Sequence, residues 1–198
     1  LENSSDTIYG VLNGTKEIKA LGSKHYDVSA FGGTTNLVYD EKNKRVESEF
    51  LSLSGTEANC SGGSTPWGTW LTCEESVNKK SKKEKSHGYV FEVYPNDKMN
   101  LQKAKPLKEL GRFNHEAVAF DTFGNAYLTE DRPDGLFYKY KPNKKGDLNN
   151  GQLFALAIKS PKLYLVILSL LEILKIPSLL NSINFKTPSA SSLTWIGL

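Results

Sequence analysis

An internal repeat in the central part of the chain constrains its fold more than any other feature. When Gly68 is aligned with Gly124, 56 positions later, Glu75 falls on Asp131 without a gap. Each repeat then continues into a strand-like run that opens on a glycine followed by aromatic and branched residues. A period near 50 residues, built of several strands per unit, is typical of β-propellers. The repeat therefore favours a propeller.

Short strand-like runs of branched and aromatic residues fill the first 160 residues and alternate with turn residues. No long segment with helical periodicity interrupts them. The sequence thus predicts an all-β fold, and among sandwiches, barrels and propellers the repeat selects the propeller. The expected strands are residues 35–39, 46–53, 67–72, 88–94, 117–120, 126–129, 136–140 and 153–158.

A change in composition near residue 160 predicts two parts. Residues 1–160 are assigned to propeller blades, and residues 161–198 to a divergent C-terminal segment. Within that segment, residues 163–176 are largely apolar, and the polar residues Ser169, Glu172 and Lys175 recur every third residue. This pattern predicts a packing helix with one thin polar stripe. An interfacial segment and a tail outside the fold are the alternatives. The run is too short, and too interrupted by charge, to span a bilayer.

The charge of the chain excludes one class of partner. The formal net charge is +3, which is too small to argue for nucleic acid. The ordinary globular composition excludes a disordered, collagenous or coiled-coil chain. The first residues lack the basic and apolar regions of a signal peptide. We therefore expect a processed chain or a piece of a longer one.

The repeat also places possible metal ligands at matching positions. Cys60 aligns with Glu116, just as Glu75 aligns with Asp131. Equivalent positions of neighbouring blades converge on the central channel of a propeller, where carboxylates repel one another unless a cation neutralises them. Carboxylates suit calcium, magnesium or ferric iron, and a thiolate favours iron or zinc. The alternatives are acids that cap turns or face solvent, and a Cys60 that packs in the core or pairs with Cys73.

Other polar residues near these positions allow two interpretations each. His115 is either a proton-transfer group beside Glu116 or a histidine bonded to nearby backbone. Arg132 presents a planar fork suited to phosphate, or forms a salt bridge with a neighbouring acid, and Arg112 is open to the same two interpretations. His25 and His87 have no partner pattern and are expected to be structural.

The glycine-rich residues 61–64 lack the lysine and the following helix of a nucleotide-binding loop. They predict a tight backbone passage beside Cys60.

Five stretches closely resemble the PhoX-type alkaline phosphatases. The longest, residues 59–75, reads NCSGGSTPWGTWLTCEE. The others agree in order along the chain, and the resemblance covers roughly residues 30 to 158. They are GGTT at 32–35, HGYVFEV at 87–93, GRFNHEAVA at 111–119, and YLTEDR at 127–132 continuing through DGLFY at 134–138.

The resemblance implies a six-bladed propeller, of which this chain would form roughly half, with a central cluster of Fe3+ and Ca2+ that hydrolyses phosphate monoesters. Glu74 is the alternative to Glu75 as a ligand, and Glu116 and Arg132 are the expected catalytic residues. The implied metal ligands are Cys60, Glu75, Glu116, Glu130 and Asp131.

The resemblance further implies a periplasmic or extracellular protein, because family members are exported. We expect phosphate monoesters as substrates, no nucleic-acid partner and no transmembrane span. Family members continue well beyond the matching region, with further blades and ligands. The alternatives to phosphatase activity are therefore an inactive propeller fragment with a structural or protein-binding role, and a related hydrolase that acts on another ester.

Overall fold

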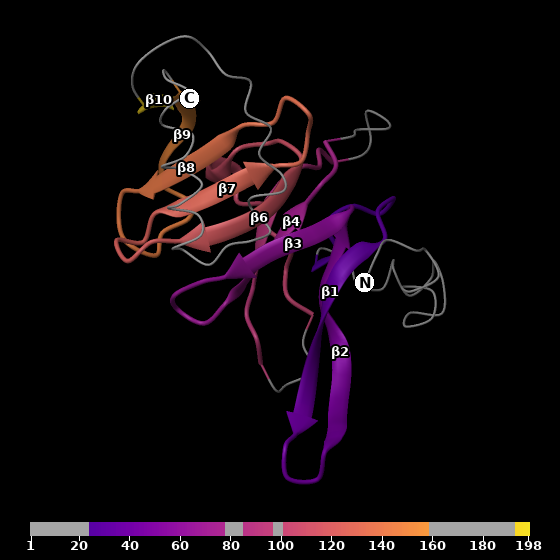
Figure 1. Ribbon diagram of the computed structural model, residues 1–198. Coiled ribbons are helices and arrows are strands. Elements are labelled where there is room, and N and C mark those ends of the chain that lie inside the picture. Colours follow the sequence, from indigo (N-terminus) through magenta and orange to yellow (C-terminus); the bar gives the residue numbers. More distant parts are fainter. Residues whose placement is uncertain (1–23, 78–84, 97–100, 159–192) are drawn as a thin grey trace.

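The computed structural model describes residues 24–77, 85–96, 101–158 and 193–198 (Figure 1). These residues form strands and one short 3-10 helix, η2 (Lys108–Leu110), and contain no α-helix, so the all-β prediction is confirmed. The strands are β1 (Gly32–Asp40), β2 (Arg45–Thr56), β3 (Asn59–Ser64), β4 (Trp70–Glu74), β5 (Val90–Val93), β6 (His115–Phe120), β7 (Ala126–Glu130), β8 (Phe137–Pro142), β9 (Gly151–Ile158) and β10 (Leu193–Gly197).

The larger sheet consists of two antiparallel meanders joined along their first strands. Its strand order is β10-β9-β8-β7-β6-β3-β4-β5. Every neighbouring pair is antiparallel except β3 and β6, which are parallel and meet where Gly62 lies opposite Ala117. Two meanders whose innermost strands run side by side in the same direction are arranged as adjacent propeller blades. The sheet does not close on itself, as expected for part of a ring.

The repeat found in the sequence coincides with the strands. β6 and β7 begin and end 56 positions after β3 and β4, respectively. The eight strands expected from the sequence are all present, with bounds that differ by a few residues. Equivalent positions of the two repeats are therefore equivalent positions of the two blades.

β3 is the strand that the sequence pattern did not reveal, because its two glycines hide any alternation of polar and apolar residues. A Cβ atom on Gly62 would lie 2.0 Å from the carbonyl oxygen of Leu71 on β4. A Cβ atom on Gly63 would lie 2.0 Å from the carbonyl oxygen of Val118 on β6. The expected tight backbone passage is thus confirmed: β3 fits between its two neighbours because these residues have no side chain.

The core lies within the two blades. Apolar side chains from both meanders form one buried cluster, and a second, smaller cluster ties the segment before β1 to the β4–β5 blade. Buried members of the second cluster are Tyr26, Leu53, Phe91, Val93 and Ala104.

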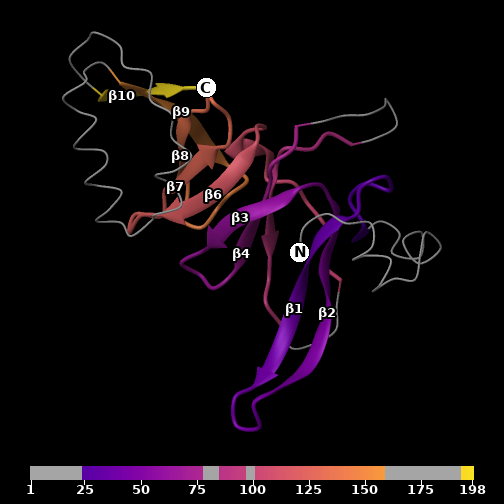
Figure 2. The same cartoon turned by 45° about the vertical axis from the view of Figure 1, so that its right-hand side comes forward.

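The β1–β2 hairpin forms a separate two-stranded sheet that projects from the blades (Figures 1 and 2). Its exposed residues include Leu37, Tyr39 and Val46.

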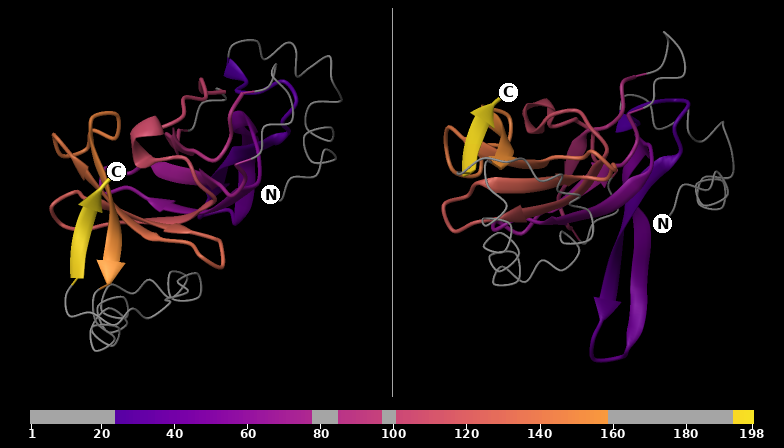
Figure 3. Two further views of the ribbon diagram at one scale, coloured as in Figure 1. Left: turned by 90° about the horizontal axis from the view of Figure 1, so that it is seen from above. Right: turned by 45° about the horizontal axis from the view of Figure 1, so that its top comes forward.

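At the other end of the chain, β10 adds to the outer edge of the larger sheet by antiparallel pairing with β9 (Figure 3). The expected helix at 163–176 lies outside the described residues, so the division at residue 160 stays a prediction.

Candidate metal centre

Three of the expected ligands meet at the end of the blades where the innermost strands begin. Cys60 is the second residue of β3, Glu116 is the second residue of β6, and Glu75 directly follows β4. Because β3 and β6 are parallel neighbours, their first residues lie at the same end of the sheet. One ligand atom from each of Cys60, Glu75 and Glu116 lies within 4.8 Å of the other two.

Both carboxylate oxygens of Glu116 accept hydrogen bonds from residues of the adjacent blade. The Cys60 thiol donates a hydrogen bond to Oε2 over 3.1 Å, and the Ser61 hydroxyl donates to Oε1 over 2.9 Å. Neighbouring residues of β3 thus fix the carboxylate of a β6 residue. The contact orients Glu116 toward Cys60 before any cation is bound.

Burial and crowding favour the protonated forms of two of these residues. Burial, and next the hydrogen bond to Glu116, raise the pKa of Cys60 to about 12. Burial, and next a hydrogen bond with the carboxylate of Asp131, raise the pKa of Glu75. A cation in the cluster would replace these protons and remove the conflict among the acids. One thiolate with several carboxylates is a donor set that fits a multivalent cation such as iron.

The structure distinguishes between the adjacent acids Glu130 and Asp131. Asp131 follows β7 as Glu75 follows β4, and its hydrogen bond with Glu75 brings it to the cluster. Oε2 of Glu130 instead accepts hydrogen bonds from the Tyr138 hydroxyl (2.9 Å) and the backbone N–H of Leu136 (3.2 Å). Asp131 is therefore the better placed of the two to join the cluster.

Glu74, the alternative to Glu75, is a buried anchor with no exposed surface. Its Oε1 accepts a hydrogen bond from the backbone N–H of Glu57 and lies 2.6 Å from Nδ1 of His87. Its Oε2 accepts from the backbone N–H groups of Gly88 (2.8 Å) and Tyr89 (3.1 Å). Both oxygens of Glu74 are thus used in hydrogen bonds that hold the fold together. Glu75 is the residue that faces the cluster.

His87 connects this anchor to the segment before β1. Its Nε2 lies 3.5 Å from Oδ2 of Asp27, so the ring bridges two buried carboxylates. Burial lowers the pKa of His87, but the carboxylates of Glu74, Glu57 and Asp27 outweigh it and raise the pKa overall. The expectation that His87 is structural is confirmed, although its acidic partners could not be recognised from the sequence because they lie far apart along the chain.

His115 is a buried structural histidine. Its Nε2 forms a hydrogen bond with the carbonyl oxygen of Gly111 over 3.2 Å, and its ring stacks on Phe113 with the centroids 3.6 Å apart. Burial lowers its pKa to about 3, so the ring is neutral at physiological pH. Of its two sequence interpretations, the backbone-bonded histidine is confirmed.

The two arginines also differ. Arg112 donates from Nε to the carbonyl oxygen of His87 over 2.8 Å and also contacts the carbonyl of Val77, so it ties loops together. The Arg132 side chain is 51% exposed, and its Nε lies 3.5 Å from Oδ1 of Asp134. Arg132 thus has a carboxylate partner but keeps an exposed guanidinium one residue after Asp131.

Cys73 lies directly opposite Cys60 across the β3–β4 pair. Both are free thiols, so the alternative in which they form a disulfide is not realised. Cys73 is fully buried, whereas Cys60 is only partly buried.

No curated protein matches the chain. A solved structure described as "Pseudomonas fluorescens PhoX in complex with vanadate, a transition state analogue" is similar, with 22% identity and a TM-score of 0.42. The match covers 64% of this chain and 32% of that chain, so it spans about a third of the relative's length.

A family model described as "Alkaline phosphatase PhoX" matches residues 32–165. This region contains every expected ligand and the strands β1 to β9. Since the match extends over more than half of the sequence, the chain belongs to the PhoX family of alkaline phosphatases.

Proposed function

We propose that this chain supplies part of a metal-dependent phosphomonoesterase. The observation that carries the proposal is the convergence of Cys60, Glu75 and Glu116 from two adjacent blades onto one small volume. Burial and crowding raise the pKa values of the Cys60 thiol and the Glu75 carboxyl, and a multivalent cation would stabilise the charged forms of both groups.

In this proposal, Cys60 and Glu116 hold ferric iron, and Glu75 and Asp131 extend the site toward calcium. Thiolate is a soft donor that adds affinity for iron, whereas carboxylate oxygens alone suit calcium. Glu130 would reach calcium through Oε1, since Oε2 is engaged with Tyr138. Bound iron and calcium would supply positive charge and Lewis acidity for displacement at phosphorus.

The residues of the chain contribute positioning and charge. Ser61 fixes Glu116 through its 2.9 Å hydrogen bond, so that the carboxylate is oriented at the reacting centre. The exposed guanidinium of Arg132 binds a phosphate oxygen of the ester, releasing Asp134. Phosphate monoesters are the proposed substrates.

We place the protein in the periplasm or outside the cell, as the family resemblance implies. Within the described residues, no helix has the length and apolar character needed to cross a membrane.

The test measures metal content and hydrolysis together. The protein is loaded with Fe3+ and Ca2+, its bound metals are quantified, and turnover of p-nitrophenyl phosphate is followed. Glu116→Gln should lose bound iron and activity, whereas the control Glu109→Gln, at an exposed residue of η2, should retain both. A Glu116→Gln variant with unchanged metal content and turnover would contradict the proposal.

The same experiment addresses the alternative that the chain is an inactive propeller fragment. Metal binding without turnover would assign the chain a metal-holding but incomplete site. In that case, activity would require the blades and ligands of a longer protein.

A further inference from the structure

The two cysteines of the chain lie directly opposite each other where β3 pairs with β4. Side chains of directly opposite residues in an antiparallel pair point to the same face of the sheet. Their Cα atoms are about 4.5–5.5 Å apart, which lies within the roughly 4.4–6.8 Å that disulfides span. The backbone positions of Cys60 and Cys73 are therefore compatible with a bond between the two free thiols.

The two sulfur atoms also lie against neighbouring peptide groups of β3. The backbone N–H of Ser61 contacts the sulfur of Cys60, and the backbone N–H of Gly62 contacts the sulfur of Cys73. The register between β3 and β4 shifts directly after Cys60, so no regular ladder holds the backbone there. A change of the Cys60 rotamer is thus sufficient to turn its sulfur from Glu116 toward Cys73.

Cys60 is the thiol that an oxidant reaches first. It is partly buried, whereas Cys73 has no exposed surface. The carboxylate of Glu116 accepts the hydrogen bond of the Cys60 thiol over 3.1 Å, so it is placed to take the proton when the sulfur attacks an electrophile. Exposure and a nearby base together make Cys60 the entry point for oxidation.

We propose that Cys60 and Cys73 form a disulfide when the metal-free chain meets a low-molecular-weight disulfide, and that this bond removes the thiol donor from the candidate metal centre. The pair would be a redox-controlled modification site. The inference rests on the proposed function for the role of Cys60 as a metal ligand, whereas formation of the bond itself requires only the two thiols.

The exchange with oxidised glutathione takes two steps. The Cys60 sulfur attacks the glutathione disulfide, whose S–S bond breaks and releases one glutathione thiol. The Cys73 sulfur then attacks the Cys60 sulfur of the mixed disulfide and releases the second glutathione thiol. Two electrons and two protons pass from the cysteines to glutathione, so the oxidant is reduced as the new bond forms.

The surroundings of the thiols set the conditions for this reaction. Burial raises the pKa of Cys60 to about 12 and also raises the pKa of Cys73. Because the thiolate is the attacking species, the exchange should be slow, on the order of hours. A cation bound to Cys60 would hold its sulfur in the cluster, away from Cys73, so metal and disulfide exclude each other.

The test counts thiols on the full chain. The metal-free protein is incubated with oxidised glutathione, and free thiols are measured by maleimide labelling and intact mass. The chain has only two cysteines, so loss of both thiols without added glutathione and without a dimer identifies the Cys60–Cys73 bond. Protein preloaded with Zn2+, a redox-inert probe for the thiolate site, should keep both thiols.

Metal affinity is measured on the same samples. Zn2+ binding, followed by calorimetry, should be at least ~10-fold weaker for the oxidised chain than for the reduced chain, since one ligand is lost. Binding should recover after the disulfide is reduced and the reductant removed.

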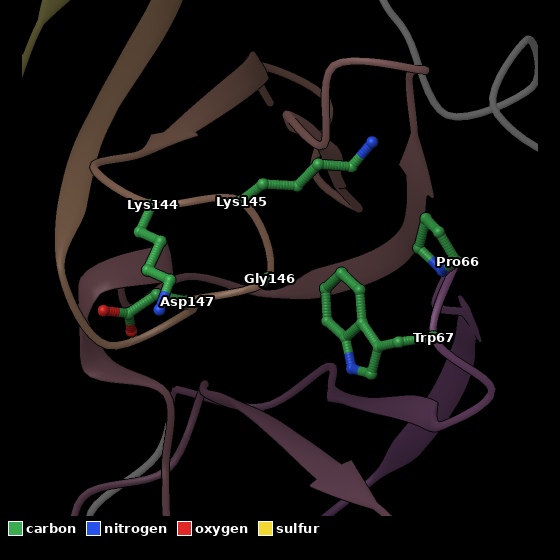
Figure 4. A pocket seen from close by; sticks show the side chains of 6 residues that line it. All are labelled: Pro66, Trp67, Lys144, Lys145, Gly146 and Asp147. Carbon is green, nitrogen blue, oxygen red and sulfur yellow. The ribbon is translucent and has the colours of Figure 1, made fainter.

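Matched variants separate the pair from general thiol reactivity. Cys73→Ser should leave Cys60 as a stable glutathione adduct, because no second thiol displaces the glutathione. Cys60→Ser should leave Cys73 unmodified, because it is buried. Lys144→Cys adds an exposed thiol to the loop that lines an open pocket with Trp67, which follows the far end of β3 (Figure 4). This added thiol should carry a glutathione adduct and so confirm that the reagent is active.

The proposal is overturned if the thiol of Lys144→Cys reacts while Cys60 and Cys73 stay free. It is equally overturned if Cys60 of the parent chain keeps its glutathione adduct, or if the disulfide joins two chains. Equal Zn2+ binding by the oxidised and reduced chains would also overturn it. A reduced chain that binds no metal would contradict the proposed function instead, and the thiol counts would still decide whether the bond forms.

Discussion

Cys60 and Cys73 face each other across β3 and β4 as free thiols, yet only Cys60 is close to the carboxylates of the cluster. The pair therefore allows a metal-binding thiol to be compared with a packing thiol at neighbouring positions. The two residues differ in burial, since Cys73 belongs to the larger core cluster.

Cys60→Ser should lower bound iron at least ~10-fold, because a neutral hydroxyl removes both the charge and the soft donor. Cys73→Ser should leave bound iron nearly unchanged but lower the free energy of unfolding by about 1–3 kcal/mol, because it places a hydroxyl in an apolar core. Metal analysis and urea unfolding of both variants check this. Equal iron loss in the two variants would remove Cys60 from the assigned ligands.

Glu74 and Glu75 offer a second matched comparison. Glu74→Gln should destabilise the fold by about 2–3 kcal/mol, since the charge-assisted hydrogen bonds from His87 and three backbone N–H groups weaken. Glu75→Gln should instead reduce bound metal with little loss of stability. Thermal unfolding and metal content are measured on both variants. The melting temperature should fall in Glu74→Gln, and the metal content should fall in Glu75→Gln. A loss of metal in Glu74→Gln with an unaltered melting temperature would reverse the assignment.

His87 should make stability fall as pH rises above neutrality. Its folded pKa is raised, so the folded state holds a proton more tightly than the unfolded state, whose histidines titrate near 6.5. This contribution is complete below pH 6.5 and is lost as pH rises through the folded pKa. The pKa values of His25 and His115 are lowered, so their effects fall on the acid side. Urea unfolding from pH 6.5 to 8 should show the decline in the parent, and a similar decline in His87→Gln would show that another group causes it.

Gly63→Ala should disrupt the seam between the blades. Its Cβ atom would lie 2.0 Å from the Val118 carbonyl oxygen, so the backbone of β3 or β6 must move, at a cost of about 3 kcal/mol or more. Metal affinity should fall with stability because Cys60 and Glu116 separate. Gly68→Ala meets no atom within 4 Å and should cost only about 1–2 kcal/mol through its positive φ. Calorimetry that ranked Gly68→Ala as the more damaging change would contradict this account of β3.

The sequence predicted the blades well because their information is local and repeated. The offset from Gly68 to Gly124 gave the spacing of β3 and β4 relative to β6 and β7, and with it the equivalence of Cys60 and Glu116. A repeat in a propeller implies equivalent positions in space, so convergence of these side chains could be expected from their numbering. The strand that carries Cys60 was missed because Gly62 and Gly63 have no side chains to show a pattern.

Long-range partners could not be read from the sequence. Nothing near His87 in the chain indicates that Asp27 and Glu74 would enclose it, since the three residues meet only after the blade has folded. For the same reason, the choice between Glu74 and Glu75 required the structure. Alternation along a strand shows that neighbouring residues face opposite sides, but not which side holds the cluster.

The single parallel contact between β3 and β6 has a mechanical consequence. Each meander is held by ladders with several registered residue pairs, whereas the backbone pairing between the two described meanders has the single registered pair Gly62 and Ala117. Under tension along the chain, the blades would part at this seam before either meander unravelled. A cation bound by both Cys60 and Glu116 would cross-link β3 and β6 at this seam. The force needed to separate the blades would therefore rise when the metal binds.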